Sequence, residues 1–218
     1  MSGSPSSASS SGPSSCGSPD PLTARGKEIL RHAIERFAQT GYASTDVQQI
    51  ADDAGIGKGT VYRCFANKEA LFLAAARFAR DSVMEAVDLS TAGETDPLTY
   101  LKKGMRSFLR YFDEHPEVVE LLIEERALTR GKRVATFFDK SGSRSDCWHN
   151  IFQQLIDSKV LRPLTTSEIE DAISRHLWGA LFVNYFAGSP APLEGQFERV
   201  LDTLIHGIGA ADKAKGAS

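Results

Sequence analysis

Apolar residues recur along most of the chain with the three- and four-residue spacing that places them on one face of an α-helix. The first such stretch covers about residues 23–40, and Gly41 follows it where a helix C-terminus favours glycine. No alternating run of Val, Ile and Thr closed by Asn-Gly or Asp-Gly, which would indicate a β-hairpin, occurs in the sequence. The pattern therefore predicts an all-α protein.

Three more helices are predicted directly after Gly41. The pattern Thr45-x-x-Gln48 is typical of a capping box and predicts that a short second helix opens at Thr45. Residues 54–57 form a tight turn, after which residues 58–65 are expected to be a third short helix. Asn67 is a favourable cap for a long fourth helix.

Five further helices bring the predicted total to about nine. Asp96-Pro97 and His115-Pro116 each place proline where the first turn of a helix accepts it. The last three helices are expected at about 132–158, 167–187 and 193–208, and Ser167-x-x-Glu170 is a capping box for the second of them. Ser141-Gly142-Ser143 is a weak point at which the helix at 132–158 can break.

The composition argues against several classes of protein. Residues 1–19 are Ser, Gly and Pro apart from Met1, Ala8 and Cys16, which predicts a disordered tail rather than a signal peptide. The longest apolar stretch without a charge, 177–187, is far shorter than the ~20 residues of a membrane span. Three widely spaced cysteines do not indicate a disulfide framework or a zinc site and fit a reducing compartment. We therefore expect a cytoplasmic protein that does not enter membranes.

The charge is distributed unevenly along the chain. Residues 20–80 carry nine Lys or Arg against seven Asp or Glu, whereas residues 81–218 carry sixteen against twenty-one. A mildly basic N-terminal third on an acidic remainder is a weak indication of a polyanionic partner, and random scatter of charge remains the alternative.

The two short helices predicted around the glycine turn form a helix-turn-helix. In proteins that bind DNA with this motif, the second helix lies in the major groove. Ala51 is small enough for the two helices to approach, and Gly55 lies where the turn needs a positive φ. The outward-facing residues suit phosphates and base edges; they are Lys58, Gly59, Thr60, Tyr62 and Arg63. The same hairpin also occurs in proteins that never contact DNA, so the pattern alone leaves both interpretations open.

Specific residues of this region carry a family resemblance. The string ILRHAIERFAQTGYASTDVQQIADDAGIGKGTVYRCFANKEALF contains Gly-aromatic-x-x-Thr, Ile-Ala, Ala-Gly-hydrophobic, Lys-Gly-Thr-hydrophobic-Tyr-x-x-Phe and Asn-Lys-Glu-x-Leu in that order. Residues 23–73 thus resemble the DNA-binding domain of the TetR family of transcriptional regulators. Two departures are Gly57, where the family usually has serine, and Cys64, where an aromatic residue is common.

The resemblance implies a set of DNA contacts. Thr60 and Tyr62 would bind phosphates through their hydroxyls, and Lys68 would bind one at the N-terminus of the fourth helix. Lys58 and Gly59 would approach base edges. Thr45 could bind a phosphate and Gln48 an adenine. The implied partner is an inverted-repeat operator in double-stranded DNA, bound by a homodimer.

The remainder of the chain is expected to bind a ligand and to dimerise. The predicted domains are a tail at 1–19, a helix-turn-helix domain at 20–70, a sensing and dimerisation bundle at 71–210 and a frayed tail at 211–218. Candidate ligand contacts are Phe108, Phe112, Phe137, Trp148, Phe152, His176 and Asn184. The candidate dimer stripe is Phe197, Leu201, Leu204 and Ile205. The fourth helix, from Lys68 to Val83 and Val87, is expected to transmit ligand binding to the DNA-binding domain.

Enzyme motifs are missing from the sequence. The run 55–60 lacks the spacing of a phosphate-binding loop, neither Gly-x-Ser-x-Gly nor His-Glu-x-x-His occurs, and no two histidines are three or four residues apart. We therefore predict no catalytic residue, cofactor or metal. The preferred interpretation is a repressor released from DNA by a small hydrophobic molecule. The alternative is a DNA-binding scaffold whose helical body recruits a protein partner.

Overall fold

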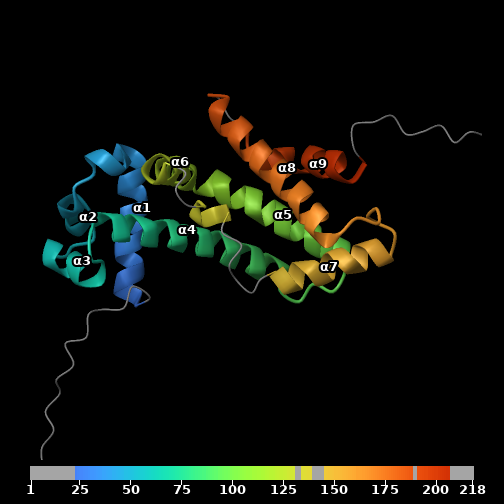
Figure 1. The fold of residues 1–218 in the computed structure, drawn as a ribbon, viewed down its shortest axis with the longest axis horizontal. Helices are drawn as coiled ribbons and strands as arrows, with labels where there is room; N and C mark the ends of the chain where they lie inside the picture. Colours follow the sequence, from blue (N-terminus) through green and yellow to red (C-terminus); the bar gives the residue numbers. More distant parts are fainter. Residues whose placement is uncertain (1–22, 131–133, 139–144, 189–190, 207–218) are drawn as a thin grey trace, which may run out of the picture.

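A computed structural model describes residues 23–130, 134–138, 145–188 and 191–206. The predicted tails at 1–19 and 211–218 and the weak point Ser141-Gly142-Ser143 lie outside these residues. Within them the fold consists of helices, as the sequence predicts (Figure 1). None of these helices combines the length and the apolar composition that crossing a bilayer requires.

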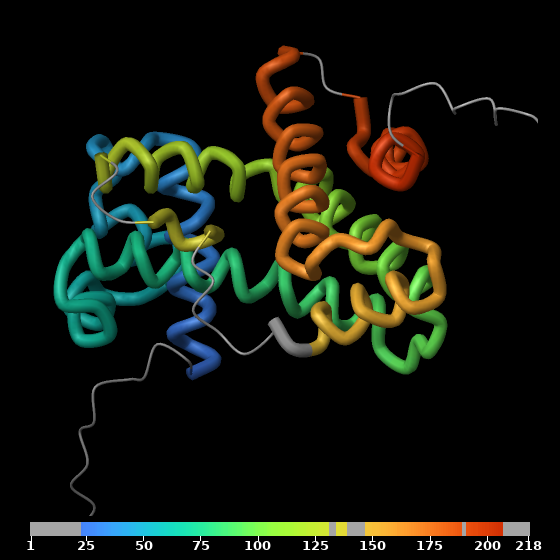
Figure 2. Tube along the Cα trace, turned by 45° about the vertical axis from the view of Figure 1, so that its right-hand side comes forward, coloured from blue at the N-terminus to red at the C-terminus, as the bar shows by residue number. Residues whose placement is uncertain are grey.

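The N-terminal part of the fold, here called the head, consists of α1 (Ala24–Ser44), α2 (Val47–Asp53) and α3 (Lys58–Cys64). The long helix α4 (Lys68–Thr91) starts beside the head and runs into the rest of the molecule, here called the body (Figure 1). The other helices of the body are α5 (Pro97–Glu114), α6 (Glu117–Thr129), α7 (Ser145–Asp157), α8 (Thr166–Phe186) and α9 (Leu193–His206). Seen from two directions, α8 is steeply inclined to α5 and rises beyond it (Figures 1 and 2).

Two helix starts differ from their predicted positions by one or two residues. Asp46, not Thr45, caps α2, and its carboxylate accepts from the N–H of Gln48 at 2.9 Å. Thr45 cannot serve because its hydroxyl is buried and donates to the carbonyl of Gly41 at 2.7 Å. Likewise Thr165, together with Glu168, forms the capping box of α8, which therefore opens before the predicted Ser167.

The predicted helix at 132–158 is not continuous in the part of it that the structure describes. Its described residues form a single 3-10 turn, Thr136–Phe138, and then α7. Glu125 of α6 is almost fully buried and accepts hydrogen bonds from both the N–H and the hydroxyl of Thr136, at 3.0 and 2.6 Å. These bonds connect Thr136 to α6, and Arg80 of α4 donates to the carbonyl of Thr136 at 3.3 Å, so segment 134–138 packs on α4 and is bonded to α6 instead of forming the first turns of α7.

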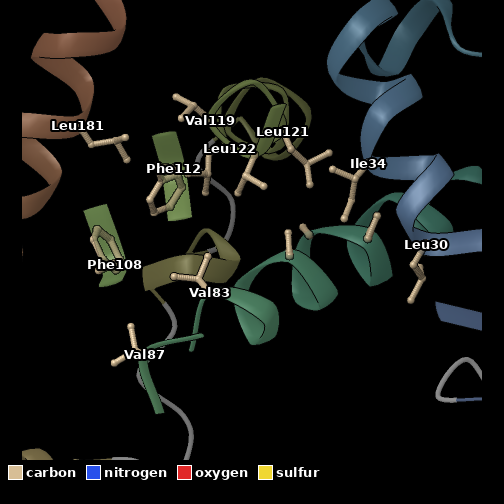
Figure 3. Close-up of a cluster of buried hydrophobic side chains, with 14 of the residues drawn as sticks. Leu30, Ile34, Val83, Val87, Phe108, Phe112, Val119, Leu121, Leu122 and Leu181 are labelled. Carbon is tan, nitrogen blue, oxygen red and sulfur yellow. The ribbon is translucent and has the colours of Figure 1, made fainter. Parts of the chain in front are cut away.

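One hydrophobic core joins head and body. Ile34 of α1 faces Leu121 of α6, and Val83 of α4 and Phe112 of α5 belong to the same cluster (Figure 3). Helix α6 contacts both α1 and α4, so it lies at the junction of the two parts. Because the core is continuous, displacement of α6 requires side chains of the head to repack.

Helix α9 is held on α5 by polar as well as apolar contacts. Both carboxylate oxygens of Asp113 in α5 accept from the first two N–H groups of α9, those of Leu193 and Glu194, at 2.8 and 2.9 Å. Arg106 covers the ring of Phe197, with 4.7 Å between the guanidinium carbon and the ring centroid. The helix is therefore capped by a residue about 80 positions away in sequence.

We expect Asp113→Ala to remove this cap and to lower the free energy of unfolding by about 0.5–2 kcal/mol, the usual cost of losing an N-cap. Urea unfolding followed by far-UV circular dichroism measures the change. Glu114→Ala, which truncates the exposed neighbouring acid at the end of α5, is the control and should leave the midpoint unchanged. A wild-type midpoint for Asp113→Ala would contradict the role assigned to this carboxylate.

Candidate nucleic-acid interface and ligand pocket

The turn between α2 and α3 has the geometry of a helix-turn-helix. Gly55 has a φ of +63°, and the N–H of Ile56 bonds the carbonyl of Ala51 at 2.9 Å. Ala51 and Val61 are fully buried between the two helices. The positive φ is the conformation that glycine adopts without strain, and the small Ala51 allows the close approach that the sequence predicts.

The surface of α3 carries the side chains predicted to contact DNA. Tyr62, with 43% of its surface exposed, and Arg63 both face solvent, and Gly59 lies on the same exposed surface. A guanidinium nitrogen of Arg63 donates to the hydroxyl of Thr60 at 2.9 Å. The structure therefore brings these residues together on one accessible helix, as a groove-binding helix requires.

Lys58, at the start of α3, forms an ion pair in this structure. Its ammonium lies 2.9 Å from a carboxylate oxygen of Asp46, the cap of α2. The N–H of Gln48 and this ammonium hold the pKa of Asp46 below its usual value, and the carboxylate in turn raises the pKa of Lys58. To reach a base edge, Lys58 must exchange Asp46 for DNA. The sequence did not signal this pairing, because the two residues are twelve positions apart on different helices.

Lys68 lies at the N-terminus of α4, next to the end of α1. Its ammonium donates to the carbonyl of Ala43 at 3.1 Å and lies 4.8 Å from the ring centroid of Tyr42. Tyr42 in turn packs edge-on against Phe72 of α4. These contacts fix the position of the Lys68 charge relative to the helix-turn-helix.

Two other predicted DNA contacts are engaged within the protein. Thr45 is only 3% exposed, and its hydroxyl bonds residues of α1. The side-chain amide of Gln48 donates to Asp52 at 2.7 Å. A further ion pair within the head was not predicted from the sequence: Arg36 of α1 forms two hydrogen bonds to Asp53 at the end of α2. The DNA contacts of Thr45 and Gln48 stay predictions.

The residues predicted to bind a ligand fall into separate groups. Phe108, Phe112 and Phe137 surround Trp178, with ring centroids 5.5 to 5.9 Å apart. Trp148 and Phe152 form a second cluster on α7, with ring centroids 5.9 Å apart, and Tyr100 of α5 packs edge-on against Trp148.

The two polar members of the predicted ligand set bond elsewhere. Nδ1 of His176 lies 2.8 Å from the carbonyl of Ala172 in its own helix. The side-chain oxygen of Asn184 accepts from Gln196 of α9 at 2.8 Å. The structure therefore does not unite the predicted set: Phe108, Phe112 and Phe137 lie around Trp178, whereas Trp148 and Phe152 form a separate pair.

A pocket of about 450 Å³ lies between α6, segment 134–138 and α8. Its walls are apolar except for one arginine; the lining residues are Leu122, Ile123, Arg126, Val134, Ala135, Phe138 and Phe182. None of the seven residues predicted to bind a ligand is among them. Phe138 and Phe182 belong to the aromatic-rich part of the sequence, but nothing in the sequence signals that α6 forms a wall, because that depends on the path of segment 134–138.

The predicted dimer stripe is partly covered by the chain itself. Phe197 and Leu201 are buried against the body, whereas Leu204 and Ile205 are half-buried. Two large apolar side chains of α8 are exposed instead, Val183 at 73% and Phe186 at 70%. Packing of α9 onto α5 turns Phe197 and Leu201 inward, which leaves little of either for a partner chain.

Comparison with known proteins identifies the class of protein. Residues 29–75 match the family described as bacterial regulatory proteins, tetR family. Over 197 residues the chain is 32% identical to the HTH-type transcriptional repressor KstR2 of Mycobacterium tuberculosis, and the match covers 86% of this chain and 94% of KstR2. The chain therefore belongs to the TetR family of transcriptional regulators, which are not enzymes. It spans only 42% and 63% of two other regulators that it matches, YerO and YuxN of Bacillus subtilis, at 30% and 33% identity.

Solved structures share the fold at low sequence identity. The fatty acid degradation regulator FadR from Bacillus halodurans has a TM-score of 0.73 at 16% identity, covering 87% of this chain and 98% of FadR. FadR from Bacillus subtilis, in complex with stearoyl-CoA, has a TM-score of 0.69 at 18% identity, covering 84% and 98%. These similarities confirm the all-α TetR-type architecture. Among the described residues, no group of three or more His, Cys, Asp or Glu side chains could hold a metal ion.

We expect Tyr62→Phe to weaken operator binding about fivefold, because a phosphate hydrogen bond contributes about 0.5–1.5 kcal/mol.

Lys68→Ala should weaken binding to all sequences alike and lower the slope of log K against log salt by about 1. Fluorescence anisotropy between 50 and 300 mM salt, with an operator selected from random DNA, measures both. Lys102→Ala, on the exposed face of α5, controls for net charge. An unchanged salt slope for Lys68→Ala would contradict a phosphate contact by that residue.

Proposed function

We propose that this protein is a cytoplasmic, homodimeric repressor that binds an inverted-repeat operator and is released from it by a small, largely apolar ligand. The observation that carries the proposal is the pocket of about 450 Å³ in the body. Its size falls within the ~300–1,000 Å³ typical of small-molecule sites.

The lining of the pocket favours an apolar molecule with an anionic group. Six of the seven lining residues are apolar, and Arg126 adds a guanidinium that suits a carboxylate or a phosphate. The FadR structure from Bacillus subtilis, whose fold is similar, holds stearoyl-CoA, a molecule with both features. The matched relative KstR2 is named a repressor, which supports repression as the sign of regulation.

The proposed dimer uses α8. Val183 and Phe186 lie on consecutive turns of this helix and expose most of their apolar surface. Monomeric soluble proteins rarely expose large apolar patches. Leu204 and Ile205 of α9 extend the proposed surface. Pairing of α8 and α9 with their copies in a second chain would bury these side chains and set the spacing of the two recognition helices, which must match half-sites about 34–36 Å apart.

We expect Phe186→Glu to produce monomers and to abolish operator binding at nanomolar protein concentration, because the charge would be buried in the proposed interface. Sedimentation velocity and anisotropy on the same samples measure both effects. Leu89→Glu is the matched control, since Leu89 of α4 is equally exposed, at 72%, but lies outside the proposed interface. A dimeric Phe186→Glu protein would place the interface elsewhere.

Ligand and operator should weaken each other's binding by the same factor, because linkage is reciprocal. Trp178 reports on the pocket, since its ring packs against Phe138 and Phe182 with centroids 4.9 and 5.9 Å away. Stearoyl-CoA, decanoate and 1-decanol are titrated by Trp178 fluorescence in a Trp148→Phe background, with and without operator. A probe that binds in the pocket and leaves operator affinity unchanged would favour the scaffold alternative.

A further inference from the structure

We propose that Glu124 is the positioning residue through which occupancy of the pocket controls the orientation of the head. The inference rests on the proposed function, because it assumes that operator binding responds to the pocket. It assigns the transmission to one turn of α6, residues 122–126, rather than to α4.

Glu124 connects α6 to the backbone of the head. One carboxylate oxygen accepts from the N–H of Tyr42 at 2.8 Å. The other lies 3.1 Å from the position that a Cβ atom at Gly41 would occupy, so a side chain there would press against the carboxylate. Gly41 has a φ of +76°, which interrupts α1 and presents the N–H of Tyr42 toward α6. The positive φ therefore favours glycine at position 41, and a Cβ atom there would require the carboxylate to shift slightly.

The same turn of α6 forms one wall of the pocket. Leu122, Ile123 and Arg126 line it, and Glu124 lies between them in sequence on the side that contacts the head. An α-helix is stiff over a single turn, so a ligand that displaces the lining residues also displaces Glu124. No residue of α4 is itself among the lining residues, although Arg80 of α4 donates to the carbonyl of Thr136, in the segment that forms another wall, at 3.3 Å.

The opposite wall is fixed to this turn as well. Glu125 accepts from the N–H and the hydroxyl of Thr136, in a site where all three groups are buried. Thr136 belongs to the segment whose Val134 and Ala135 line the pocket. A buried carboxylate bonded in this way is costly to separate from its donors, so the segment and α6 should move together.

Within the head, the residues that Glu124 contacts adjoin Lys68, which is predicted to bind a DNA phosphate. The ring of Tyr42 lies under the ammonium of Lys68, which also bonds the carbonyl of Ala43. A shift of residues 42–43 therefore moves the Lys68 charge relative to α3. Since half-sites are read at a fixed separation, a small rotation of each head is enough to lower operator affinity.

The experiment mimics an occupied pocket without a ligand. Ala135→Trp places a large side chain into the pocket, and it is combined with Glu124→Ala in a double-mutant cycle. Operator affinity is measured by anisotropy for the four proteins, with a selected operator. Ala135→Leu is a smaller filler for the case that tryptophan prevents folding. Glu124→Gln retains an acceptor oxygen, and Glu117→Ala removes a carboxylate at the other end of α6, where its partner is His115.

We expect Ala135→Trp to weaken operator binding at least about fivefold in the wild-type background, at the lower end of known allosteric couplings. In the Glu124→Ala background the same substitution should change operator affinity less than about twofold. The response should be retained with Glu117→Ala and largely retained with Glu124→Gln. An equal effect of Ala135→Trp with and without Glu124 would overturn this inference and leave the proposed function intact. No effect of either filler in any background would overturn the inference, and the ligand–operator titration would then decide the proposed function by itself.

Discussion

Helix α6 carries apolar side chains around most of its circumference, and the need to bury them makes the head and the body share one core. Val118, Val119, Leu121 and Leu122 are all nearly inaccessible to solvent, and α6 contacts both α1 and α4. Close-packed cores change by switching between discrete arrangements rather than by continuous deformation. The orientation of the head is therefore a property of how α6 packs. This is why the break in α1 at Gly41, which receives the side chain of Glu124, has consequences beyond its own helix.

Much of the fold follows from local patterns in the sequence, and the errors have local causes. Helical periodicity and the Gly55 turn predicted the helices of the head because their apolar residues pack against near neighbours. The helix starts at Asp46 and Thr165 were misplaced because several cap-forming residues stand side by side, and the choice among them depends on which side chain tertiary packing buries. The path of segment 134–138 could not be predicted, since it depends on hydrogen bonds to a buried carboxylate eleven residues away.

The two candidate sites differ in how far the sequence reveals them. The residues of α3 that are predicted to contact DNA come from one short segment, so their spacing alone places them on one surface. The pocket takes its walls from α6, segment 134–138 and Phe182 of α8, and side chains so far apart in sequence are brought together only by packing. The aromatic residues that suggested a ligand site, such as Phe108 and Phe112, instead fill the space around Trp178. Aromatic content alone could not distinguish a wall from a filled core.

The ion pair between Asp46 and Lys58 gives the recognition surface an internal competitor for DNA. A carboxylate already occupies the ammonium in the free protein, so an arbitrary phosphate must displace a partner of the same sign of charge. Each non-specific encounter thereby loses part of the electrostatic gain that a bare lysine would provide. A cognate sequence can compensate through additional bonds to base edges, whereas random DNA cannot. If Lys58 contacts DNA as predicted, cognate and random sequences both require this exchange, so the pair weakens both complexes and leaves the contacts to base edges to distinguish them.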